Sequence, residues 1–198
     1  MTLHRDAAPL RALFLALVLA TTSSAQATET IAFGGPDGQI DIGEPTIEGS
    51  FVYEPISGAL YRGGSRGNAA PDLEGRFTTG GGVARIARAD VPGGFFTFDA
   101  VDVGQSGIGI TLIDAEGYLG GVLVGSQSFT TSGVTNDFTT FAATNFDSLL
   151  LDELRFNLDA DPGWESIDNL VLTTVIPEPM AFGLAMACVA VGLAHRRR

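Results

Sequence analysis

The middle of the chain consists of short segments in which apolar and polar residues alternate. A period of two is typical of a β-strand that buries one face, because successive side chains point to opposite sides of a sheet. Between the two ends of the chain, no stretch of ten or more residues has the 3.6-residue period of an amphipathic helix. The pattern predicts an all-β fold, an antiparallel β-sandwich, with strands within residues 46–53, 83–90, 96–103, 108–113, 122–130, 138–141, 149–158 and 167–175.

Two irregularities in this pattern predict local geometry. Apolar residues occupy positions 96 and 98 and then positions 101 and 103, so the alternation slips by one residue at Asp99-Ala100. Such a slip indicates a β-bulge or a break in the strand. Farther along, Leu119-Gly120-Gly121-Val122 predicts a tight hairpin, because two glycines tolerate the positive φ of a primed turn.

The first 27 residues have the order of parts that is typical of a secretory signal peptide. Arg5 and Arg11 provide positive charge, and residues 12–20 form an apolar stretch. Small residues follow, and they fit a cleavage site after Ala25 or after Ala27. We therefore expect residues 1–27 to direct the chain to the Sec export machinery, and residues 28–175 to form the working body of the protein.

Residues 176–198 contain a Pro-Glu-Pro triplet, an apolar run over residues 180–194 and a basic end. The two prolines keep the triplet extended and outside the helix that follows. The 15 residues of the apolar run would form a helix about 22 Å long, short of the roughly 30 Å hydrocarbon core of a membrane. Basic side chains can snorkel to the surface and hold the C-terminus in the cytoplasm, so the segment predicts a short transmembrane helix. The residues of the triplet and of the basic end are Pro177, Glu178, Pro179, Arg196, Arg197 and Arg198.

This C-terminal arrangement resembles the PEP-CTERM sorting signal of proteins exported by Gram-negative bacteria. The resemblance implies recognition by an exosortase-type membrane transpeptidase that acts near the triplet. The protein would then be held transiently by its C-terminal segment before it reaches the cell surface or the extracellular space. An ordinary single-pass anchor is the alternative.

The body carries a second resemblance. Residues 67–73, 87–102, 117–130 and 164–172 look like a jelly-roll module that is common in PEP-CTERM proteins. Such modules are similar in outline to carbohydrate-binding sandwiches. The resemblance implies a fold more than a function, because what the relatives bind is mostly unassigned.

The composition of the body excludes several kinds of chemistry. Residues 28–175 contain no cysteine and no histidine, and the whole chain has no lysine. A Ser-His-Asp triad, a cysteine nucleophile, a Schiff-base lysine and a zinc site of histidine and cysteine are therefore excluded. Six arginines stand against 21 carboxylates in this range, a net charge of −15. Nucleic acid and anionic membrane surfaces are consequently poor partners, whereas cations are good ones.

The segment before the last predicted strand is the candidate cation site. Asp159, Asp161, Glu165 and Asp168 lie in or near Asp161-Pro162-Gly163-Trp164, which fits a type II turn. Carboxylates are the hard oxygen ligands that calcium prefers, so calcium is the expected ion, although the spacing is not that of an EF-hand. The alternative is that the aspartates only form turns and cap backbone N–H groups.

Two further side-chain groups have alternative interpretations. Trp164, the only tryptophan, is either a platform for a sugar ring or a residue packed beneath the sandwich. Asp99 and Asp102 could form an acid–base pair, but the period of a strand predicts that they point to opposite faces and are solvated.

Three functional hypotheses follow from these observations. The first, which we favour, is an exported non-catalytic module that binds or lies among extracellular polysaccharides. The second is a purely structural surface or biofilm protein without a small ligand. The third is a carboxylate-dependent glycan hydrolase or lyase, for which a body without histidine or lysine offers little material.

Overall fold

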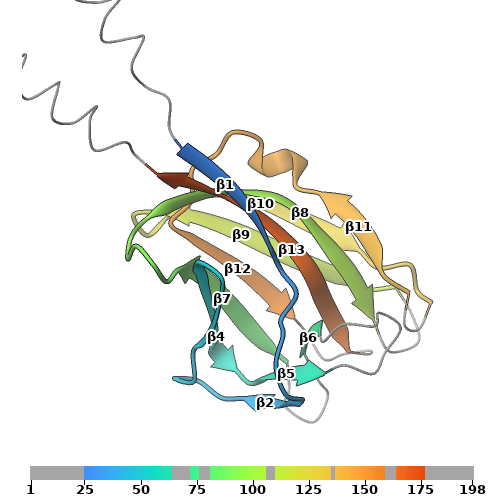
Figure 1. The fold of residues 1–198 in the computed structure, drawn as a ribbon. Coiled ribbons are helices and arrows are strands. Elements are labelled where there is room, and N and C mark those ends of the chain that lie inside the picture. Colours follow the sequence, from blue (N-terminus) through green and yellow to red (C-terminus); the bar gives the residue numbers. More distant parts are fainter. Residues whose placement is uncertain are drawn as a thin grey trace, which may run out of the picture. The chain divides into compact units, whose positions relative to one another are not determined.

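Two antiparallel sheets packed face to face make up the body of the protein (Figure 1). The computed structural model describes residues 25–63, 72–75, 81–105, 110–134, 137–158 and 164–176. Within the chain, Ala27–Val175 form one compact unit. The predicted signal peptide and sorting segment lie outside the described residues, apart from positions 25–27 and 176. No helix in the described ranges is long and apolar enough to cross a membrane.

The first sheet, called sheet A here, has the strand order β11-β8-β13-β6-β5-β2, and β1 also pairs with β13. In this sheet β8 pairs with β11 and β13, β6 pairs with β13 and β5, and β5 pairs with β2, all antiparallel. Its strands are β1 (Ala25–Ile31), β2 (Gly38–Ile40), β5 (Leu60–Gly63), β6 (Asp72–Gly75), β8 (Phe95–Gln105), β11 (Thr139–Ala142) and β13 (Glu165–Ile176).

The second sheet, sheet B, has the order β10-β9-β12-β7-β4-β3. From β6 onward the chain passes from one sheet to the other at almost every step, because β6, β8, β11 and β13 belong to sheet A and the strands between them to sheet B. The strands of sheet B are β3 (Thr46–Glu48), β4 (Phe51–Gly58), β7 (Gly82–Arg88), β9 (Leu112–Leu119), β10 (Val122–Thr130) and β12 (Glu153–Leu158). A short 3-10 helix, η1 (Thr144–Phe146), lies between β11 and β12.

The inward side chains of the two sheets form one apolar core. Its aromatic centre is Phe98 on β8, whose ring centroid lies 6.2 Å from that of Phe129, 5.1 Å from Phe146 and 5.7 Å from Phe156. These rings come from both sheets and from η1, so they hold the two layers together. The prediction of an all-β sandwich is confirmed.

Both predicted irregularities are present. Gly120 and Gly121 have φ values of 59° and 78° and connect β9 to β10 as a two-residue turn. In β8, Phe98 and Val101 are both buried, and the register with β13 shifts beside Ala100. The slip read from the sequence is therefore a β-bulge.

The expectation of one strand over residues 46–53 is wrong. β3 ends at Glu48 and β4 begins at Phe51, so this stretch is a hairpin. Gly49, with a φ of 57°, permits the turn. Ile47 is consequently 69% exposed, whereas Phe51 and Tyr53 are buried. The alternation did not reveal the turn, because the exposed Ile47 stands in step with the buried Phe51 and Tyr53 in the sequence, although the register pairs it with Val52 on the opposite face.

The first and last strands lie side by side (Figure 1). The hydroxyls of Thr28 and Thr173 are 2.8 Å apart, and the Thr174 hydroxyl donates to the carbonyl of Ala27 at 3.1 Å. Ala27 thus lies opposite Thr174 and Thr28 opposite Thr173, so the two strands run in opposite directions and form an antiparallel pair. The body therefore begins and ends at neighbouring positions of sheet A.

Candidate functional site

Charged side chains cover the outer face of sheet B. On β7, Ala84 and Ile86 are buried in the core while Arg85 between them points outward. The register then places Arg85 between Glu54 of β4 and Arg155 of β12. We call this surface the sheet B face, and its polar residues are Glu54, Arg85, Asp114, Glu116, Tyr118, Asp152, Glu153, Arg155 and Asn157.

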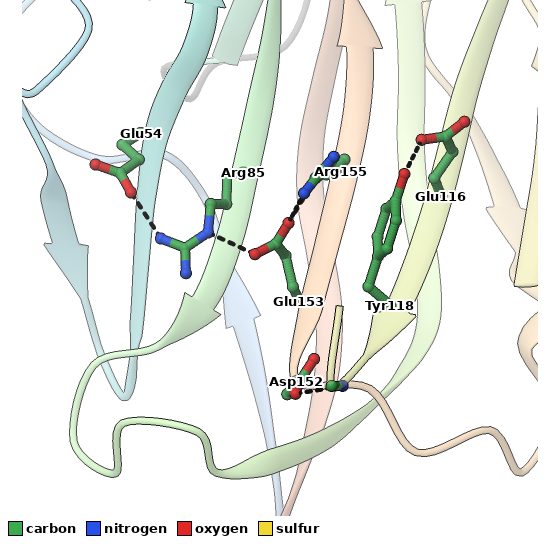
Figure 2. A network of polar contacts seen from close by, with 8 residues as sticks. Glu54, Arg85, Glu116, Tyr118, Asp152, Glu153 and Arg155 are labelled. Atoms are coloured by element: carbon green, nitrogen blue, oxygen red, sulfur yellow. Dashed lines mark hydrogen bonds and ion pairs between the residues drawn. The ribbon is translucent and has the colours of Figure 1, made fainter. Parts of the chain in front are cut away.

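Ion pairs join three neighbouring strands across this face (Figure 2). The Arg85 guanidinium donates to Glu54 at 2.7 Å and to Glu153 at 2.8 Å. The second oxygen of Glu153 accepts from Arg155 at 2.5 Å. The result is a ladder of alternating charges, Glu54–Arg85–Glu153–Arg155, in which each group is held by a neighbour.

An aromatic ring extends the ladder onto β9. The guanidinium carbon of Arg155 lies 4.2 Å from the ring centroid of Tyr118, within the range of a cation–π contact. The Tyr118 hydroxyl donates to Glu116 at 2.6 Å, and this hydrogen bond raises the pKa of Tyr118. Beyond it, the Ser128 hydroxyl of β10 donates to Asp114. Polar contacts thus run over four strands of sheet B and reach the fifth.

The ladder fixes side-chain positions more than it stabilises the fold. The side chains of Arg85 and Arg155 are each 33% exposed, and Glu153 is 18% exposed. Ion pairs that reach solvent in this way contribute about 1 kcal/mol or less each. Their main physical consequence is that long, mobile side chains are held in a single arrangement, which lowers the entropy that a ligand would have to remove.

Two hollows flank the ladder on the same face. One, the hairpin hollow, has a volume of about 340 Å³ and lies among Val52, Arg85, Pro92, Gly121 and Glu153. The other, the Asn157 hollow, measures about 240 Å³, and its lining residues are Val83, Asp114, Glu116, Arg155 and Asn157. Both hollows combine hydrogen-bond donors with acceptors, which is the chemistry that a hydroxyl-rich ligand requires.

The protonation state of the central carboxylate follows from its partners. Partial burial raises the pKa of Glu153, but the hydrogen bonds from Arg85 and Arg155 outweigh burial and hold its pKa below the usual range. Glu153 is therefore ionised at neutral pH. A carboxylate with a lowered pKa is a poor proton donor, so the arrangement favours binding over general-acid catalysis.

The predicted calcium ligands divide into two groups. Asp159 and Asp161 lie outside the described residues. Glu165 and Asp168 lie on β13, both buried, and their separation of three residues directs them to opposite faces of the strand. In the part of the chain that the structure describes, no three carboxylate, histidine or cysteine side chains form a group that could hold a metal ion.

Trp164 and the pair Asp99 and Asp102 are the remaining candidates. Trp164 is half-buried just before β13, a strand of sheet A, and lines neither hollow. The carboxylate of Asp99 accepts from Thr97 and Thr173, and that of Asp102 from Thr140 and Asn169. The expectation of opposite faces was wrong for these two aspartates, because the bulge between Phe98 and Val101 turns both outward.

A buried acidic pair lies on the outer face of sheet A. Asp72 and Glu74 flank the core residue Leu73 on β6, and they are only 3% and 1% exposed. Both side-chain oxygens of Asp72 are buried without a hydrogen-bond partner. Burial and then the neighbouring charge of Glu74 raise the pKa of Asp72 to about 8. Asp72 is therefore mainly protonated at neutral pH.

Sequence analysis did not identify the sheet B face. The alternation in residues 83–90 places Arg85 on a solvated face, and this was the available signal. The partners of Arg85, however, lie 31 and 68 residues away in the chain. Their meeting depends on strand order and register, which a period of two does not specify.

Comparisons with known proteins concern the fold. No protein-family model matches the chain, and no curated protein matches it. A family 29 carbohydrate-binding module from Piromyces equi is similar in structure, with a TM-score of 0.44 and 11% identity over 76% of this chain and 91% of that chain. The Stig cyclase Fisc from Fischerella sp. TAU has a TM-score of 0.35 and 16% identity over 72% of this chain and 99% of that chain.

Proposed function

We propose that this protein is an exported, non-catalytic β-sandwich module that associates with extracellular polysaccharide through the sheet B face. The observation that carries the proposal is the pair of hollows on one sheet face, each lined by fixed carboxylate and guanidinium groups. A sugar hydroxyl both donates and accepts hydrogen bonds, so it can use both kinds of group at once.

The arrangement of strands supports a jelly-roll for this module. In a jelly-roll, eight strands form two Greek keys divided between two sheets, and most steps along the chain cross from one sheet to the other. The eight strands β6 to β13 follow that course, with β6-β13-β8-β11 in one sheet and β7-β12-β9-β10 in the other. On this proposal β1 to β5 are additions that widen both sheets.

Substitution of Glu116 by alanine is expected to weaken glycan binding about tenfold or more. Its carboxylate lies at the Asn157 hollow and holds Tyr118, and a hydrogen bond to a charged group is worth about 1.5–3 kcal/mol. A glycan array probed with the full-length protein identifies a ligand, and titration calorimetry then measures the loss.

Asp41→Ala is the matched control for this measurement. Asp41 is exposed, accepts a hydrogen bond from Gln39 and lines neither hollow. We expect this variant to bind as the wild type does. Equal binding by the Glu116 and Asp41 variants, with unchanged melting temperatures, would remove the sheet B face from the proposal.

Sorting to the cell surface is the second part of the proposed function. It is supported by the Pro-Glu-Pro triplet, the apolar run and the basic end within residues 176–198. Handling by an exosortase-type transpeptidase is proposed from the resemblance of these features to a PEP-CTERM signal.

Deletion of residues 176–198 is expected to release the body into the periplasm or the medium, because the deletion removes the whole sorting segment. Cell fractionation followed by immunoblotting measures the released fraction. The mature wild-type protein should also lack its last residues. Intact-mass spectrometry that finds Arg198 on surface-attached protein would contradict exosortase handling and favour a plain anchor.

One observation favours a second candidate, a purely structural surface protein. The ladder satisfies its own charges, since the guanidiniums of Arg85 and Arg155 already have carboxylate partners. A face of this kind needs no ligand to be stable. Surface attachment without binding to any glycan on the array would support the structural role.

A further inference from the structure

We infer that the ligand of the sheet B face is an uncharged oligosaccharide that lies along β12 and occupies both hollows. The inference rests on the proposed function and adds the charge and the length of the glycan. Its support comes from the charges around the hollows, the groups that the ladder leaves available, and the distance that β12 spans between them.

The local charge disfavours an anionic glycan. The ladder and its continuation onto β9 contain two guanidiniums, Arg85 and Arg155, and a larger number of carboxylates. Arg88, which also lines the hairpin hollow, is paired with Asp90 at 2.5 Å. Arg85, Arg155 and Arg88 are thus all paired with carboxylates. A uronate would meet excess negative charge there, and each of these three guanidiniums already has an acidic partner. Like charges brought together at an interface cost several kcal/mol.

An uncharged glycan can use what the ladder leaves available. A guanidinium has five N–H donors, and two donors of Arg85 hold Glu54 and Glu153. A carboxylate can accept about four hydrogen bonds, and Glu116 accepts one from Tyr118. Neighbouring hydroxyls of a sugar can fill such positions without introducing charge.

The position of the hollows indicates a ligand longer than one sugar. Glu153 lines the hairpin hollow and Asn157 lines the other, so the hollows lie at opposite ends of β12. Four residues of strand separate these two positions, which corresponds to about 13 Å at 3.3 Å per residue. Arg155, midway between these two residues on the strand, also lines the Asn157 hollow, and it contacts Glu153 and the ring of Tyr118. A chain of several sugar units can reach from one hollow to the other.

Titration of the full-length protein in mild detergent tests this inference. The probes are neutral oligosaccharides of the gluco, manno and xylo series, from one to six units, and oligogalacturonates and oligomannuronates of equal length. We expect the tightest binding from a neutral series, with affinity rising roughly tenfold or more between one and four units, which corresponds to about 1.4 kcal/mol or more. Affinity should be nearly the same at low and high salt, because an uncharged ligand has no long-range attraction to screen.

Variants that fill one hollow at a time test whether a single oligosaccharide occupies both hollows. Val52→Trp places bulk in the hairpin hollow, and Val83→Trp places it in the Asn157 hollow. Each should weaken binding of the longer oligosaccharide. Val134→Trp is the matched control, because Val134 is 59% exposed and lines neither hollow. Melting temperatures confirm that all three variants fold.

The outcomes separate this inference from the proposed function. Preferred binding of uronates, weakened by salt, would overturn the inference and leave polysaccharide association intact. A single sugar that binds as tightly as four, or a longer chain insensitive to one of the two filled hollows, would overturn the span. Failure of both neutral and anionic glycans to bind would overturn the proposed function itself.

Discussion

Replacement of Asp72 by asparagine is expected to raise the melting temperature at pH 8 and to remove most of the loss of stability between pH 5 and pH 8. The carboxyl of Asp72 is buried beside Glu74, and both of its oxygens lack a hydrogen-bond partner. Asparagine has nearly the same shape but stays neutral at every pH in this range. The variant therefore avoids the cost of either holding a proton or burying a charge.

The sign of the pH effect follows from the raised pKa. In the folded protein the pKa of Asp72 is about 8, whereas its ordinary value is 3.8. Between these values the folded state keeps a proton that the unfolded state has released, so the free energy of unfolding falls as pH rises. The fall ends above pH 8, where both states are ionised. Its full size is on the order of 5 kcal/mol, or roughly 10–20 °C in melting temperature.

Thermal melts of the wild type and of Asp72→Asn at several pH values between 5 and 9 measure this difference. Asp41→Asn is the control, because Asp41 is an exposed carboxylate. It should leave the pH dependence of the wild type unchanged. A parallel decline of the Asp72 variant and the wild type would show that Asp72 does not hold a proton in the folded state.

Truncation of Phe98 to alanine is the second large expected effect, a loss of about 3–5 kcal/mol in the free energy of unfolding. Phe98 is 2% exposed, and its ring is in contact with three other phenylalanines that belong to β10, β12 and η1. Removal of the ring leaves a cavity between the two sheets that its rigid neighbours cannot fill. The loss corresponds to a fall of roughly 6–20 °C in melting temperature, which calorimetry measures.

Phe141→Ala is the matched control for the core prediction. Phe141 also contacts Phe129, with ring centroids 5.6 Å apart, but it lies at the margin of the core and is only partly buried. We expect it to lose less than half as much stability as Phe98→Ala. Equal losses would contradict the view that Phe98 is the centre of packing between the sheets.

Several strands could be predicted from sequence because their signal is local, whereas β1, β2, β5, β6 and most of β9 were not among the predicted segments. A buried face leaves an apolar residue at every second position, as on β4, β7 and β12. The bulge in β8 and the turn at Gly120 and Gly121 also have local causes, a shift of phase and two adjacent glycines. The hairpin at Gly49 escaped detection because the exposed Ile47 stands in step with the buried Phe51 and Tyr53, so the sequence shows no change of phase where the chain turns.

The candidate site could not be predicted, because it depends on contacts between distant parts of the chain. Glu153 meets Arg85 only because β12 pairs with β7 in one particular register, and a slip by one residue would send Glu153 to the core. The buried state of Asp72 was equally hidden. Residues 67–73 were linked to a fold only by resemblance, and nothing local in them shows that Asp72 is buried in a strand beside β13.

The pairing of β13 also has a mechanical consequence. Since β8 pairs with β13 from Glu165 to Val175, β6 and β1 must share its other edge. Tension applied to the chain beyond Val175 would pull β13 along its own axis, parallel to its neighbours. The hydrogen bonds on both edges of β13 would then carry the load at the same time, instead of breaking one after another. If the protein is tethered through its C-terminal segment, traction from a surrounding matrix thus reaches the strand of sheet A with the most lateral support.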